Sequence, residues 1–150
     1  MAQLRLIALA LAACSASDAA PAPVPLATVP AGWVPLPAMA LAARAAIAGS
    51  STDAWGEPAK GCYAATLVFG ERGTVAALLA EVKQAVSLRD VVEPSAAGGV
   101  LSFGFDKAPY KGRVRATLDG KTVTALACFW NDREPAACET ACTAMLGSMQ

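Results

Sequence analysis

Four cysteines are the residues whose number and spacing point most directly to chemistry: Cys62, Cys128, Cys138 and Cys142. Thiol redox centres and structural zinc sites usually contain a Cys-x-x-Cys pair, which the spacing of Cys138 and Cys142 does not match. An even number of cysteines in a protein that faces an oxidising compartment indicates disulfides instead. The sequence therefore predicts four disulfide cysteines, no metal site and no cofactor.

These four cysteines allow three pairings. Cys138 and Cys142 fall one turn apart on an expected helix, where a bond between them would strain the helix. Each is therefore expected to reach across to a strand. Distances counted from the turn at residues 131–134 favour the pairs Cys128–Cys138 and Cys62–Cys142.

Histidine is absent from the chain, which excludes Ser-His-Asp and Cys-His arrangements as well as histidine-ligated metals. Paired carboxylates remain, either Asp90 with Glu93 or Asp132 with Glu134. Both pairs fall in expected loops or at a helix start, where acidic residues commonly serve as solvated or capping groups. We therefore expect a protein that is not an enzyme, and keep a histidine-free hydrolase as the third alternative.

Basic residues gather around an expected hairpin, and Lys107 adjoins a candidate patch formed by Lys111, Arg113, Arg115 and Lys121. One interpretation is a charged sheet face that discourages strand-to-strand aggregation. The other is an anion-facing patch for lipopolysaccharide phosphates, peptidoglycan carboxylates or an acidic partner protein. The formal net charge of the chain is zero, so nucleic acid is not an expected partner. Tryptophans are more often core or loop-packing residues than ligand contacts, and Trp130 is the one of the three to be tested as a surface contact.

A fifth cysteine follows an export-like start. An apolar run after Arg5 ends in the sequence Leu11-Ala12-Ala13-Cys14, with two small residues before the cysteine. This resembles the lipobox of bacterial lipoproteins. The resemblance implies that residues 1–13 are removed and that Cys14 carries a diacylglyceryl thioether and an N-acyl chain such as palmitate. Several acyl chains together give a practically permanent membrane anchor.

The resemblance also bears on location. Ser15 follows the cysteine, where lipoproteins kept in the inner membrane often carry aspartate, so an outer-membrane anchor facing the periplasm is favoured. The inner membrane and the cell surface are alternatives, as is an ordinary cleavable secretory signal. The apolar run from Leu6 to Ala13 is too short for a membrane-spanning helix, which needs roughly 20 residues.

The mature chain divides into a tether and one domain. Residues 14–30 begin with the acylated cysteine and are rich in Pro and Ala, a composition typical of an extended, semi-rigid spacer. Residues 31–150 are long enough for one disulfide-stabilised domain and too short for two of ordinary size.

Hydrophobic periodicity and turn signals predict an α+β domain with the element order α-β-α-β-β-β-α and a roughly four-stranded sheet. Residues 50–61 are expected to form a loop. The sheet includes a C-terminal meander closed by the Asp119-Gly120 turn. The expected helices are 37–48, 74–86 and 133–148, and the expected strands are 62–69, 100–106, 111–118 and 121–130.

Side-chain alternation sharpens this expectation. A two-residue turn at Asp119-Gly120 would set Leu118 opposite Lys121. Arg113, Arg115 and Cys128 would then share one face of the sheet, and Cys62 would lie on that same face.

These features lead to three expectations of function. The first is an envelope lipoprotein that binds or positions another envelope component, either a protein or an anionic polymer. The second is a periplasmic carrier of lipid or another small ligand, which would need a sizeable apolar pocket between helix and sheet. The hydrolase is the third.

Overall fold

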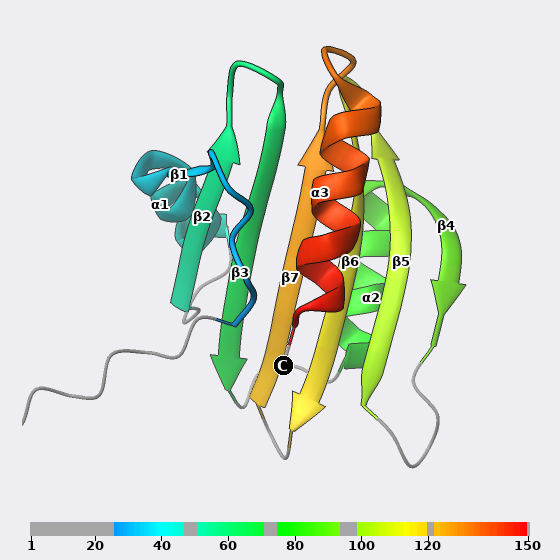
Figure 1. The fold of residues 1–150 in the computed structure, drawn as a ribbon. Coiled ribbons are helices and arrows are strands. Elements are labelled where there is room, and N and C mark those ends of the chain that lie inside the picture. Colours follow the sequence, from blue (N-terminus) through cyan, green and yellow to red (C-terminus); the bar gives the residue numbers. More distant parts are fainter. Residues whose placement is uncertain (1–25, 47–50, 71–74, 94–98, 120–121, 150) are drawn as a thin grey trace, which may run out of the picture.

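The computed structural model describes residues 26–46, 51–70, 75–93, 99–119 and 122–149. Ten elements follow one another in this part of the chain (Figure 1). Three are helices: α1 (Pro37–Ala46), α2 (Val75–Ala85) and α3 (Pro135–Gly147). The seven strands are β1 (Val34–Pro35), β2 (Ser51–Glu57), β3 (Cys62–Gly70), β4 (Ser87–Val92), β5 (Val100–Lys107), β6 (Tyr110–Asp119) and β7 (Thr122–Trp130).

The described strands form a single sheet in the order β1-β2-β3-β7-β6-β5-β4. All neighbouring strands pair antiparallel. The α+β class is therefore retained, but the expected four-stranded sheet is wrong, because the sheet has seven strands. Strands β1, β2 and β4 were missed.

The missed strands lack strong sequence signals of their own. Strand β2 contains Gly56 and few β-branched residues, and it was assigned to a loop; it is held between β1 and β3 by backbone pairing. Strand β4 is interrupted by a register shift between Arg89 and Val92, where Asp90 has a positive φ of 51°. A bulge of this kind breaks the alternation by which a strand is recognised in a sequence.

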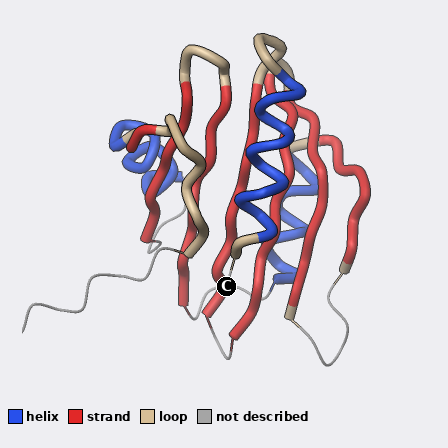
Figure 2. The backbone as a smooth tube through the Cα atoms, in the orientation of Figure 1, coloured by secondary structure: helices blue, strands red, loops and turns tan. Residues whose placement is uncertain are grey.

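Helices cover both faces of the sheet (Figures 1 and 2). On one face, α2 packs Leu79 against Phe103 and Val123, while α1 contributes Ala40 to a smaller cluster with Ala54 and Ala65. On the other face lies α3. Its buried residues meet those of β3 and β7 in the cluster Cys62, Ala64, Leu126, Cys128, Trp130, Cys138, Cys142, Met145 and Met149.

The chain before β1 also packs on the α3 face. Ala27 is buried in the α3 cluster, with Leu26, Val29 and Trp33 against it. The backbone N–H of Thr28 donates to Oγ of Ser148 beyond the end of α3, at 2.8 Å. This loop runs along the α3 side of the sheet in Figure 2. Residues 26–30 are therefore part of the packed domain, and the expected boundary of the tether at residue 30 lies too far along the chain.

The β6–β7 register differs from the expected one. Asp119 pairs with Thr122 and Leu118 pairs with Val123, so the expected pairing of Leu118 with Lys121 is wrong by two residues. Side chains alternate with a period of two, and a two-residue shift leaves every side chain on its expected face. Accordingly, Arg113 lies opposite Cys128 and Arg115 opposite Leu126, on the α3 face.

None of the helices in the described ranges combines the length and apolar character needed to cross a membrane. Three features of the sequence lie outside the described residues. They are the signal-like segment, Cys14, and Gly120, the second residue of the expected turn.

Candidate functional site

A groove opens on the α3 face of the sheet, over strands β5 and β6. Phe103, Val114 and Ala116 point to the α2 face, so the residues that alternate with them point to the α3 face. Helix α3 lies over β7 and borders the groove with Leu146. The groove encloses about 240 Å³ and is lined by Asp90, Val100, Ser102, Phe103, Gly104, Arg113, Val114, Arg115 and Leu146.

Three arginines meet in or beside this groove. Arg89 on β4 pairs across the sheet with Gly104 on β5, which in turn pairs with Arg113 on β6; Arg115 follows on the same face. The side chain of Arg89 lies across Gly104, where an added Cβ would come within 2.9 Å of its Cγ. A glycine at this position therefore lets the arginine lie flat on the sheet.

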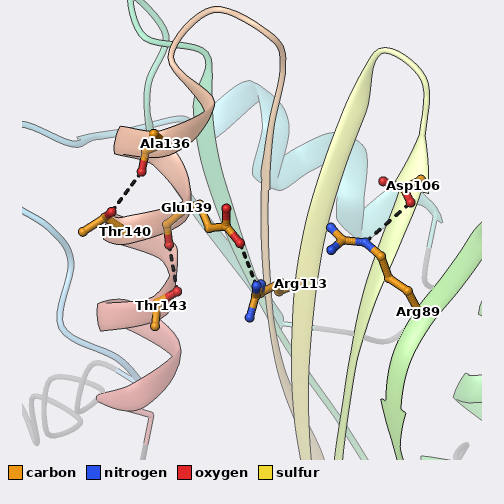
Figure 3. Close-up of polar contacts among 7 residues, drawn as sticks. All are labelled: Arg89, Asp106, Arg113, Ala136, Glu139, Thr140 and Thr143. Atoms are coloured by element: carbon orange, nitrogen blue, oxygen red, sulfur yellow. Dashed lines mark hydrogen bonds and ion pairs between the residues drawn. The ribbon is translucent and has the colours of Figure 1, made fainter.

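Two of these arginines have acidic partners, which Figure 3 draws with them. Nη2 of Arg113 donates to Oε1 of Glu139 on α3 at 2.6 Å. Nε of Arg89 lies 3.5 Å from Oδ2 of Asp106 on β5, close enough for an ion pair but without hydrogen-bond geometry. Both pairs are partly exposed, so each contributes only about 0.2–1 kcal/mol to stability.

Of the three arginines in or beside the groove, Arg115 is the one without an acidic partner among the described residues. Within the described ranges no acidic group pairs with it, and Asp90 is the acidic residue that lines the groove. The Nε atoms of Arg89, Arg113 and Arg115 are all buried without a hydrogen-bond partner. Buried polar groups normally have partners, so unsatisfied guanidinium donors mark a place where an anionic acceptor would be stabilised.

The structure brings together only part of the predicted basic patch. Arg113 and Arg115 line the groove. Lys111 shares the face of Arg113 and Arg115 but is exposed at the start of β6, outside the groove. Lys121 lies outside the described residues. Arg89 was missed, because β4 was not predicted. The sequence signal for β4 was the change from apolar Leu88 to charged Arg89 just before the bulge.

Trp130 is a core residue, as favoured for the tryptophans, and it does not form the surface contact that was the alternative. Its side chain is 4% exposed and belongs to the α3 cluster. The strand that carries Trp130 lies in the middle of the sheet and is covered by α3.

The carboxylate pairs considered for catalysis do not form a site. Glu93 pairs with Nζ of Lys83 at 3.4 Å, and Asp90 sits in the β4 bulge. Asp132 and Glu134 are exposed in the turn before α3. The described residues also contain no group of three or more Cys, Asp or Glu side chains placed to hold a metal ion.

The disulfide in the structure joins Cys62 to Cys138, with the Cα atoms 5.2 Å apart. The favoured pairs Cys128–Cys138 and Cys62–Cys142 are therefore wrong. Cys62 lies opposite Trp130 at the end of the sheet where α3 begins, and Cys138 lies in the first turns of α3. Strand β3 places Cys62 nearer than Cys128 to that end of the sheet, which distances along the chain from the turn do not reveal.

The other two cysteines are buried thiols. Cys128 on β7 and Cys142 on α3 both lie in the α3 cluster. A hydrogen bond with the Cys142 thiol, followed by burial, raises the pKa of the Cys128 thiol well above its ordinary value.

No protein-family model matches this sequence, and a search of the curated proteins found no relative.

Proposed function

We propose that this protein is a bacterial envelope lipoprotein whose domain binds a carboxylate-bearing envelope polymer in the arginine groove and performs no chemistry on it. The observation that carries the proposal is Arg115, a half-buried cation without an acidic partner among the described residues, beside two further arginines with unsatisfied Nε donors. Peptidoglycan, with carboxylates on its peptide stems, is the polymer of this chemistry that an anchored envelope protein would meet.

A carboxylate ligand is favoured over a phosphate by the contact that already exists at the groove edge. Arg113 binds the carboxylate of Glu139 there. The planar guanidinium fork matches the two oxygens of a carboxylate, so Arg115 can bind a second carboxylate in the same way. The groove is open along the sheet, which suits one segment of a polymer better than an enclosed small molecule.

The anchor is the second part of this proposal. It depends on Cys14, which follows the lipobox-like sequence, and it would hold the domain beside the outer membrane with the groove facing the periplasm. Because residues 26–30 pack on the domain, the spacer shortens to residues 14–25. Fatty-acid labelling of the native chain and of Cys14→Ser tests the anchor. Label that appears on the native chain but not on Cys14→Ser supports the anchor, whereas absence of label from both chains rejects it.

Binding to purified peptidoglycan sacculi tests the groove. Co-sedimentation of the protein with sacculi should weaken as ionic strength rises from about 0.01 M to 1 M, since the screening length falls from about 30 Å to about 3 Å. Arg115→Gln should reduce the affinity roughly tenfold or more, as expected for loss of a charge-assisted hydrogen bond. The matched control is Arg133→Gln, which removes an exposed arginine outside the groove.

Two outcomes would reject this function. One is equal loss of binding by Arg115→Gln and Arg133→Gln, which would mean a general charge effect. The other is salt-sensitive binding to lipopolysaccharide vesicles without binding to sacculi, which would identify phosphates as the ligand.

The carrier alternative is tested by the same preparations. Its best location is an apolar groove of about 350 Å³ beside α1, lined by residues that include Leu36, Ala40, Leu41 and Trp55. Lipid that co-purifies with the native chain and is displaced by Leu36→Trp would favour a carrier.

A further inference from the structure

Cys128 and Cys142 form a second pair parallel to the disulfide. Cys142 follows Cys138 by four residues on α3, an advance of about 6 Å. On the sheet, Ala64 lies opposite Cys128 two residues in from the Cys62–Trp130 pair, an advance of about 6.6 Å. Because the two advances nearly match, Cys142 comes level with the Ala64–Cys128 pair, as Cys138 is level with Cys62. Cys128 lies one strand over from Ala64 and shares its buried cluster with Cys142.

The surroundings of this second pair exclude water. Cys128 is 0% exposed and Cys142 is 1% exposed. They lie in a cluster with Leu126 and Met145, and the Cys142 thiol is near enough to Cys128 to raise the pKa of the Cys128 thiol. A thiol is a weak hydrogen-bond donor, so two reduced thiols gain little from this contact.

We propose that the oxidised protein carries a second disulfide between Cys128 and Cys142, so that α3 is fastened to both β3 and β7. Two thiols lose two electrons and two protons when they join. A disulfide-bearing oxidant, such as oxidised glutathione or a thiol oxidase protein, accepts both and is released as two thiols. The thiolate of one cysteine attacks the oxidant's disulfide, which forms a mixed disulfide and releases the first oxidant thiol. The thiolate of the other cysteine then attacks the protein sulfur of this mixed disulfide and displaces the second oxidant thiol.

Burial also determines when this bond forms. The thiolate is the attacking species, and the folded environment disfavours it at Cys128. Oxidation should therefore take place while α3 is still docking on the sheet. Once folded, the reduced pair should react with alkylating reagents at least tenfold more slowly than an exposed cysteine.

Peptide mapping of the full chain tests the proposal without relying on its location in the cell. Cys14→Ser leaves four cysteines, and this chain is denatured, reduced, refolded in a glutathione couple, and then denatured and alkylated. Trypsin followed by a protease that cleaves after Glu separates Cys138 from Cys142, because Glu139 lies between them. The four cysteine peptides are residues 61–71, 122–133, 134–139 and 140–150.

The expected products are peptide 61–71 joined to 134–139 and peptide 122–133 joined to 140–150. Alkylation of Cys128 and Cys142 in material where Cys62 is joined to Cys138 would overturn the proposal. A bond between Cys128 and Cys138 would overturn it as well. Adding Cys62→Ala and Cys138→Ala to the Cys14→Ser chain leaves only Cys128 and Cys142 and so isolates the second bond. This variant should lose its two free thiols on oxidative refolding, and their retention by a folded variant would again overturn the proposal.

Discussion

Nη2 of Arg113 on β6 hydrogen-bonds Oε1 of Glu139 on α3 at a distance of 2.6 Å, with both side chains nearly half exposed. This contact joins α3 to β6 (Figure 3). The Glu139 carboxylate thereby already binds Arg113, one of the arginines that border the groove. Glu139 therefore competes with any anionic ligand of that groove.

Glu139→Gln removes this competition. The affinity for sacculi should rise several-fold at low salt, because Arg113 becomes available and one negative charge leaves the groove edge. The free energy of unfolding should change by less than about 1 kcal/mol, since the pair is exposed. Co-sedimentation and urea titration measure the two effects. Glu134→Gln, an exposed acidic residue before α3, should leave binding unchanged, and weaker binding by Glu139→Gln would contradict the groove assignment.

Gly112→Ala should destabilise the fold by about 1–3 kcal/mol or more. An added Cβ would overlap the ring of Phe105 and the backbone oxygen of Cys128, and a backbone atom in a central strand cannot move aside. Urea titration of the purified variant measures this loss. Gly147→Ala is the matched control, because nothing lies within 4 Å of its added Cβ; equal stability of the two variants would mean that the β5–β6–β7 packing is wrong.

Leu126→Ala should cost about 2–5 kcal/mol, since Leu126 is fully buried beneath α3 and its removal leaves a cavity. Leu41→Ala on α1 removes the same atoms from a side chain that is 63% exposed, and should change stability by less than about 0.5 kcal/mol. Thermal or urea unfolding measures both. A small effect at Leu126 would show that α3 does not pack on β7.

Ala27→Asp tests whether the packed domain begins before residue 31. A carboxylate placed in the α3 cluster should lower the unfolding free energy by about 1–3 kcal/mol, because Ala27 is 5% exposed. Ala31→Asp provides the control at an exposed position. If both variants match the native chain in urea titration, residues 26–30 belong to the tether after all.

The reduced protein should lose stability at alkaline pH. The pKa of Cys128 in the folded state is raised above its ordinary value of 9.0. The stability that the protonated Cys128 thiol contributes is therefore fully present below about pH 9 and is lost as pH rises further. Above that pH the unfolded chain releases a proton that the folded chain retains. The free energy of unfolding should therefore fall by up to about 1.4 kcal/mol per pH unit. Urea titrations of reduced protein across this range should show a smaller slope in Cys128→Ala. An unchanged slope would mean that the thiol pair does not perturb Cys128.

Local patterns were sufficient for the elements that carry strong periodicity. The helices 37–46, 75–85 and 135–147 and the strands of the meander were predicted with end points shifted by a few residues. Alternation also placed Arg113, Arg115, Cys62 and Cys128 on one face, which survived an error of two residues in register because side chains repeat every second residue.

The amino-acid sequence by itself determined the helical and strand periodicity, the absence of histidine, the even number of cysteines after Cys14, and the face on which the arginines lie. Only the tertiary structure decided that β2 and β4 are strands, that Arg89 joins Arg113 and Arg115, that Trp130 is buried and that Cys62 pairs with Cys138. The physical reason is that these features depend on backbone pairing and packing between segments far apart in the chain, whereas periodicity depends on neighbouring residues alone.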